Sequence, residues 1–591
     1  MFPKLKELPT QRQMVEVFKG YNHNLRIGDG EFFDMKNLVS DYYPVLAPRG
    51  MRGVYASPEA PGGMIAKDAL CYIDGNDFVM NGYPIDMGLN DEGPKQLISM
   101  GAYVIIMPDK KYINTADLTD FGNIEAEYKS TAAVSFTLCK LDGSEYIVEY
   151  TQPDEPAEPA NMALWIDTSS KPHALRQWSE SSGMWVSIAT CYVKISAPGI
   201  GKAFEKYDGI TISGLKEKLY DAASGEEIAA DDIAALEGAA IVWDKGDDFI
   251  IVVGMLDETR TISNEVTISR KMPNLDFVVE SENRLWGCRY GVAANGDVVN
   301  EVYASKLGDF KNWNCFMGIS TDSYTASVGT DGQFTGAITL PGQVLFFKEN
   351  CIHKVYGNYP ANFQIQTTLC RGVQKGCERS LAIVNEIIYY KAKHAVCAYD
   401  GSLPREISSE LGDVRYKTAV AGAHGNKYYI SMEDTAGAWH LFVYDTAKGM
   451  WHKEDDLQAD CFCSCREEMY CIDHKTKKII TMLGSGTRDT GKVKWMAQTG
   501  PIGTSMPDMK YVSRLVVRMS LNIGTRVRFL AQYDSMGGWE HLGQLTGTNM
   551  RSFSTPIRPR RCDHFRLRIE GEGEARIYSI TKTIEQGSDI S

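Results

Sequence analysis

Short apolar runs separated by turn residues recur along most of this chain. The runs 343–347, 387–390 and 427–432 are examples, and Gly, Asn or Asp lies close to each of them. Strands joined by tight turns give this pattern, because Gly, Asn and Asp tolerate the backbone conformations that turns require. One segment, Ile228 to Leu236, instead has apolar residues at helical spacing, followed by Gly238 as a stop signal. The pattern therefore predicts an all-β protein with one short helix.

The even spacing of the hairpins in residues 272–490 predicts a β-propeller. A four-stranded blade takes about 40–45 residues, so a region of this length favours several blades over a single sandwich. The spacing Asp-x-x-Gly-x-Trp at Asp434 and Asp534 is typical of hairpin turns. Residues 1–122 and 272–490 are therefore assigned to one discontinuous propeller.

The rest of the chain divides into two further units. Residues 123–271 contain the Pro-rich acidic stretch 152–159 and the helical segment, which predicts an inserted α+β domain. In residues 491–591, apolar and polar side chains alternate, for example over 515–521 and 565–569. Half-buried antiparallel strands alternate in this way, so we expect a compact C-terminal β-sandwich of the jelly-roll type.

Composition and charge narrow the possible functions. The chain has 591 residues, 43% of them apolar and 23% charged, which is typical of a globular protein and excludes disorder of the whole chain. Its net charge of −14 disfavours a general nucleic-acid binder. Residues 491–591 carry 15 Lys and Arg against 9 Asp and Glu, so this segment is +6 and the rest is −20. Either the two ends face different partners, or the arginines decorate a solvated face.

The N-terminus and the cysteines indicate where the protein is made. No apolar leader follows Met1, and no run of about 18 apolar residues occurs. The 14 cysteines are therefore expected to be reduced thiols in a protein made in a cytoplasm, with no membrane span.

Candidate chemistry is sparse. Cys461, Cys463 and Cys465 form the most metal-like cluster, but alternate residues on a strand point their sulfurs in parallel, whereas zinc knuckles wrap around the ion. Packed core thiols are the favoured interpretation. The motifs of serine hydrolases, zinc proteases and P-loop enzymes do not occur. The residues thus point to no catalytic, metal-binding or cofactor-binding site and to no cofactor.

Two segments resemble a known family. Residues 283–289, Asn-Arg-Leu-Trp-Gly-Cys-Arg, are followed by Val-Tyr-x-Ser-x-x-Gly-Asp-x-x-x-Trp at 302–313. This hairpin resembles one found in β-propeller tail proteins of tailed bacteriophages. Residues 29–38 and 44–49 are similar to the way such proteins begin their first blade. We call the following five residues the signature hairpin and expect them to be structural: Arg284, Trp286, Tyr303, Asp309 and Trp313.

The resemblance implies a virion structural protein that is not an enzyme, and it implies that the insert at 123–271 is a platform-like domain. Such proteins are hub, nozzle, stabilisation or adaptor components of the tail, and they form a homo-oligomeric ring, usually sixfold, around the DNA channel. The expected partners are other tail and portal-adaptor proteins and double-stranded DNA that passes without sequence-specific binding. An acidic channel wall repels the DNA backbone and lets it slide. The expected location is the virion tail, after synthesis in the host cytoplasm.

Two alternatives stay open. The chain can be a receptor- or glycan-binding tail module, in which Tyr533, Trp539 and His541 of the sandwich would stack on sugars. It can also be a propeller-fold glycosidase or lyase, in which case histidines and carboxylates would converge in a deep central pocket.

Overall fold

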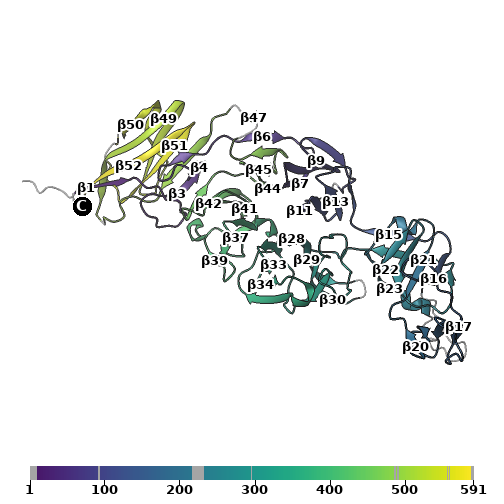
Figure 1. Ribbon diagram of the computed structural model, residues 1–591. Helices are drawn as coiled ribbons and strands as arrows, with labels where there is room; N and C mark the ends of the chain where they lie inside the picture. The colour runs from purple at the N-terminus through teal and green to yellow at the C-terminus, as the bar shows by residue number, and fades with distance from the viewer. Residues whose placement is uncertain are drawn as a thin grey trace, which may run out of the picture.

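The computed structural model describes residues 10–90, 93–215, 232–293, 296–484, 487–488, 491–506, 508–555, 557 and 560–586. Almost all regular structure in these residues is β, as the sequence predicts. Figure 1 shows three regions in a row: a sandwich at one end, a propeller in the middle and the insert at the other end. No helix in the described ranges is long and apolar enough to cross a membrane.

The middle region is a seven-bladed propeller. Six blades in the described ranges each consist of four consecutive strands. They are β7–β10 (Pro61–Ala66, Leu70–Asp74, Asp77–Met80, Tyr83–Asp86), β11–β14 (Gln96–Met100, Tyr103–Met107, Lys111–Asn114, Phe121–Asn123), β28–β31 (Phe277–Ser281, Arg284–Val292, Val298–Ala304, Tyr324–Ser327), β32–β35 (Gly336–Leu340, Gln343–Lys348, Cys351–Tyr356, Gln364–Leu369), β36–β39 (Ala382–Val384, Ile387–Lys391, Val396–Tyr399, Arg405–Glu406) and β40–β43 (Tyr416–His424, Lys427–Asp434, Trp439–Asp445, Met450–Lys453).

The seventh blade closes the ring with a strand from the other end of the propeller. It consists of β44 (Ala459–Cys465), β45 (Glu468–Asp473) and β46 (Ile479–Thr481), to which β6 (Gly53–Ala56) adds; β6 also pairs with β47 (Thr487–Arg488). The first strand of this blade contacts β7 of the first blade. The seventh blade thus combines strands from both ends of the propeller, which holds the ring of blades closed.

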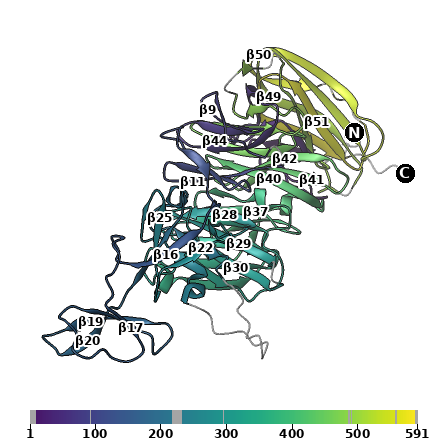
Figure 2. The same ribbon diagram turned by 90° about the vertical axis from the view of Figure 1, so that its right-hand side faces the viewer.

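The insert leaves the propeller between the second and third blades. One sheet has the order β15 (Ala126–Lys129), β27 (Thr267–Arg270), β22 (Gly209–Ser213), β23 (Gly238–Ile241), and a second has the order β24 (Asp244–Gly246), β25 (Phe249–Val253), β21 (Tyr192–Ser196), β16 (Val134–Cys139), β26 (Arg260–Ile262). A third sheet projects beyond them (Figure 2) and contains β17 (Tyr150–Gln152), β18 (Leu164–Asp167), β19 (Ala174–Ser179) and β20 (Met184–Ser187). The first two sheets share their own buried core, which includes Phe136 and Ile250.

The helix predicted over Ile228 to Leu236 is corrected. Asp232–Leu236 is a short 3-10 helix, η2, and residues 228–231 lie outside the described residues. The described part of the insert therefore has no α-helix and is a β-domain rather than an α+β one. The other 3-10 turns are η1 (Ile200–Lys202), η3 (Pro360–Asn362), η4 (Glu378–Ser380) and η5 (Ser409–Leu411).

The C-terminal sandwich is organised around one long strand. β49 (Lys510–Tyr533) pairs along one side with β50 (Glu540–Thr555), and along the other with β52 (Ala575–Gln586) and then β51 (Phe565–Glu572). The alternation predicted over 515–521 is confirmed. Leu515, Val517 and Leu521 are buried, whereas Arg518 is exposed.

N-terminal strands complete this sandwich. β1 (Thr10–Val15) pairs with β52, and β3 (Glu31–Lys36) pairs with β48 (Lys494–Thr499). β2 (Gly20–Tyr21) then joins β3 to β43, so one sheet runs from the sandwich into the sixth blade; the pair β4 (Leu38–Val39) and β5 (Ala47–Pro48) follows. The boundaries expected from the sequence place these N-terminal strands in the propeller, whereas their pairing places β1 and β3 in the sandwich.

Candidate functional site

The signature hairpin lies in the third blade, where Arg284 holds a loop in place. The side chain of Arg284 is buried. Its Nη1 donates to the carbonyl oxygens of Ser305 and Asp322, at 2.8 and 2.5 Å, and its Nη2 donates to that of Ser320 at 2.8 Å. A planar guanidinium carries several donors in a fixed fork, so one side chain fixes both ends of the 305–322 loop.

The aromatic members of the hairpin connect this blade to its neighbours. Trp286 is buried, and its ring centroid lies 4.9 Å from that of Phe363 in the next blade. Trp313 is buried among residues of the second and third blades and donates its indole N–H to the carbonyl of Phe310 at 2.9 Å. Tyr303 is half-buried and donates its hydroxyl to Glu301; burial and this carboxylate raise the pKa of Tyr303.

Asp309 begins a chain of polar contacts that leads into the insert. Its Oδ2 accepts from the Nδ2 of Asn312 at 2.6 Å, and Asn312 Nδ2 also donates to Asp208 Oδ1 of the insert at 2.9 Å. The Oδ1 of Asn312 accepts from the backbone N–H of Gly209 at 2.8 Å. Asp208 in turn forms a buried ion pair with Arg270. The hairpin therefore anchors the insert to the propeller through buried polar contacts.

Sequence reasoning missed Asn312, Asp208 and Arg270. Asn312 and Asp208 are 104 positions apart, and no local pattern marks either as a partner of the other. A Gly after Asp208 is the one available signal: a Cβ at Gly209 would lie 2.5 Å from the carbonyl oxygen of Asn314. The insert thus approaches the hairpin loop so closely that this position accommodates only glycine.

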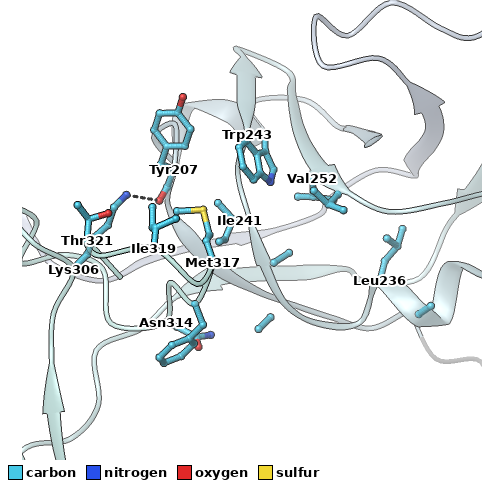
Figure 3. A pocket seen from close by; sticks show the side chains of 15 residues that line it. Tyr207, Leu236, Ile241, Trp243, Val252, Lys306, Asn314, Met317, Ile319 and Thr321 are labelled. Carbon is cyan, nitrogen blue, oxygen red and sulfur yellow. Dashed lines mark hydrogen bonds between the residues drawn. The ribbon is translucent and has the colours of Figure 1, made fainter. Parts of the chain in front are cut away.

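An apolar cavity of about 810 Å³ opens beside this joint (Figure 3). Lys306 is the only charged side chain among the described residues that line it, and its Nζ donates to the carbonyl of Tyr207 at 3.2 Å. The cavity wall offers packing surface rather than a nucleophile or an acid pair. The insert contributes Tyr207, Ile241, Trp243 and Val252, and the hairpin loop contributes Asn314, Met317 and Ile319.

A second cavity, of about 520 Å³, lies on the propeller axis, because all seven blades contribute to its lining. Six of them contribute residues of their innermost strands, and the fifth contributes Glu378, Arg379 and Leu381, which precede β36. Most of its lining is apolar, including Phe277 and Ile338. Two carboxylates, Asp276 and Glu378, reach it. Burial raises the pKa of Asp276, while a hydrogen bond of 2.8 Å from the backbone N–H of Tyr290 to its Oδ2 opposes that rise. This is the place where the glycosidase alternative would locate its chemistry.

The cysteine cluster lies on β44 and packs against apolar neighbours of the first and seventh blades. Cys461 and Cys463 are half-buried and Cys465 is buried. Burial raises the pKa of the Cys461 and Cys463 thiols. Over the described ranges, no group of three or more His, Cys, Asp or Glu side chains is placed to hold a metal ion.

The aromatic residues considered for glycan stacking are not arranged as one platform. Tyr533 is buried, Trp539 is half-buried and His541 is exposed. The guanidinium of Arg568 lies 4.1 Å from the ring centroid of Trp539 and covers that ring. Of the three, the buried Tyr533 has no open face for a sugar.

Comparison with known proteins identifies no family. No family model matches the chain, and no curated protein matches it. Among solved structures, the chain is similar to an exo-β-1,3-galactanase of Phanerochaete chrysosporium (7% identity, 52% of this chain and 94% of that chain, TM-score 0.22). It is also similar to PorZ, a surface component of the type-IX secretion system of Porphyromonas gingivalis (10%, 90% and 82%, TM-score 0.26), and to AztD from Citrobacter koseri (9%, 74% and 95%, TM-score 0.27).

These matches correct one prediction. Glycoside hydrolases, including the galactanase and an arabinoxylan arabinofuranohydrolase from Bacillus subtilis, are among the matched structures. The prediction from the sequence that the chain is not an enzyme is contradicted by these matches, and we withdraw it. Likenesses at this identity and TM-score assign no particular activity to the chain.

Proposed function

We propose that this chain is a structural component of the tail of a tailed bacteriophage, of the hub, nozzle or adaptor type, and that it assembles as a ring around the path of the DNA. The signature hairpin carries the proposal. Its residues resemble those of phage tail propellers, and Arg284 and Asp309 hold the loop on which the insert is anchored. A rigid platform on a propeller needs such a joint, because an insert on a loose linker would not keep its place in an assembly.

The distribution of charge supports a role beside DNA. Residues 123–271 contain 25 Asp and Glu against 13 Lys and Arg, so the insert has a net charge of −12. It lies at the end opposite to the sandwich, which belongs to the basic C-terminal segment (Figure 1). An acidic surface repels the phosphate backbone, and DNA beside it moves without being held.

The test is the presence and place of the chain in a virion. Purified particles of the phage that encodes it are labelled with an antibody against the insert and viewed by electron microscopy. We expect the label at the tail, and we expect particles made without the chain to have incomplete tails that do not deliver DNA. Particles that lack the chain yet have intact, infectious tails would contradict the proposal.

The axial cavity supports a second candidate, hydrolysis of a glycosidic bond. Glycosidases place two carboxyl groups around the bond, and one of them acts as an acid with a raised pKa. Asp276 and Glu378 line the same cavity, and burial raises the pKa of Asp276. The test uses the purified chain with a panel of chromogenic glycosides. This candidate requires turnover that Asp276→Asn and Glu378→Gln both abolish without loss of fold; turnover unaffected by either change, or no turnover on any substrate, counts against it.

A further inference from the structure

The sandwich leaves one long strand with an open side. β50 has 16 residues and pairs with β49, and no described strand pairs with its other side. The open side of an edge strand presents a row of backbone N–H and C=O groups that can pair with another chain. Glu540 and Arg551 are its only charged residues, and it contains no Lys or Pro, the residues that usually protect such edges. Residues 551–555 pair with β49 without a shift in register, so this part of the edge is regular.

The opposite margin of the same sheet is also open. The order β1, β52, β49, β50 makes β1 the other edge, and among the described strands β1 pairs only with β52. β1 has six residues, a length similar to that of the regular edge 551–555. Gln11 and Arg12 are exposed, and Met14 is 59% exposed. Met550 on β50 is 50% exposed, so each edge carries an apolar side chain that faces solvent in the single chain.

The directions of the strands make the two edges complementary. All three pairings between these four strands are antiparallel, so β1 and β50 run in opposite directions. If β1 of a second copy lies beside β50, the new pair is therefore antiparallel as well, and the alternation continues without interruption. Because the two edges differ, the contact is head-to-tail, and repeated head-to-tail contacts close into a ring when the rotation between copies allows it.

We propose that β1 of one copy adds to β50 of the next, and that this edge pairing joins the sandwiches of successive copies into a ring. The occupant of the open edge is thus a second copy of this chain. The pairing satisfies the free backbone groups of both edges and covers Met14 and Met550. The inference rests on the proposed function for its ring and adds the interface that holds the ring together.

The first experiment measures the size of the purified full chain by mass photometry. The wild-type chain is expected to form a closed oligomer. In Ser552→Lys/Ser554→Lys, two lysines stand on the exposed edge, and loss of the oligomer is expected, because an approaching strand would have to desolvate their charges. The matched control is Gln366→Lys, which places a lysine on β35, the outer edge of the fourth blade, and should keep the oligomer. An oligomer that survives in the double variant, or a wild-type chain that is monomeric at every concentration, overturns the proposal.

A second experiment identifies the two edges that meet. Chains with Gln11→Cys and chains with Ser554→Cys are treated with a bis-maleimide separately and as a mixture, with the wild-type chain as the background for its native thiols. A cross-linked dimer is expected in the mixture and not in either variant alone. A dimer formed by Ser554→Cys alone would show β50 paired with itself and would overturn the head-to-tail contact. Equal melting temperatures of all variants would show that misfolding does not cause the differences in cross-linking.

The outcomes for the interface and for the tail role are separable. A ring that survives lysines on β50, in a chain that is found in the tail, rejects the edge pairing and keeps the proposed function. Edge cross-links in a chain that is absent from purified particles reject the proposed function and keep the edge pairing.

Discussion

The propeller and the sandwich treat the edges of their sheets in opposite ways. The propeller uses β6 to complete its seventh blade, and its outermost strands are short, from two residues in β39 to six in β35. The sandwich instead has β50, with 16 residues, and within the described part of the chain no strand pairs with one of its two sides. A short edge strand offers little backbone for another chain to pair with, whereas a long open edge offers much more. The propeller is therefore complete within one chain, and the sandwich is the part that is suited to meet another.

The largest expected loss of stability comes from the signature hairpin, which joins the second and third blades. Trp313 is 3% exposed and packs between the second and third blades. Trp313→Ala should lower the free energy of unfolding by about 3–5 kcal/mol, because it removes a large buried ring and leaves a cavity. This loss is measured by urea unfolding, with hydrogen exchange of propeller peptides as the readout. An unchanged midpoint would show that the hairpin does not hold the blades together.

A somewhat smaller loss is expected from the clamp that holds the closing strand. Arg52, next to β6, donates to Glu454 at 2.8 Å and to Asp455 at 2.7 Å, and all three side chains are largely buried. Arg52→Met should destabilise the propeller by about 3 kcal/mol, because it leaves Arg49 to neutralise both buried carboxylates. The control is Arg371→Met, which breaks an exposed pair with Glu406 and should change stability by less than about 1 kcal/mol. Equal effects of the two changes would contradict a role of the clamp in closure.

Acid should weaken the propeller before it weakens the sandwich. Burial lowers the pKa of His353 and of His452 from 6.5 to about 4. An unfolded chain binds protons to these rings below pH 6.5 and the folded propeller does not, so stability is complete above pH 6.5 and falls as the pH drops towards 4. The expected loss is about 2–3 kcal/mol for each histidine. His353→Gln should flatten the dependence of unfolding on pH in this window; an unchanged slope would contradict the account.

The smallest effect on stability is expected at the open edge of the sandwich. Ser552 and Ser554 are exposed, so Ser552→Lys/Ser554→Lys should change the free energy of unfolding of the single chain by no more than about 0.5 kcal/mol per substitution. Thermal melts at a concentration below assembly measure this value. A large loss of stability would show that the edge serves the fold of one chain rather than contact between chains.

The sequence predicted what is local and missed what is distant. The alternation over 515–521 and the short bounded runs carry their structure in neighbouring residues, and both are confirmed. The pairing of β1 with β52 joins residues such as Thr10 and Glu585, and no local pattern encodes such a partner. The same holds for Asn312 and Asp208 in the candidate site. At Asp232–Leu236 a local pattern was misleading: apolar spacing over a few residues predicted a longer helix, and the structure has a short 3-10 helix.

The most direct test of the account is cryo-electron microscopy of the purified full chain. We expect closed rings in which neighbouring sandwiches share one antiparallel sheet, with β1 of one copy beside β50 of the next, and in which each propeller is closed by its own β6. Rings held together by other surfaces, with both sandwich edges open to solvent, would contradict it, as would single chains alone.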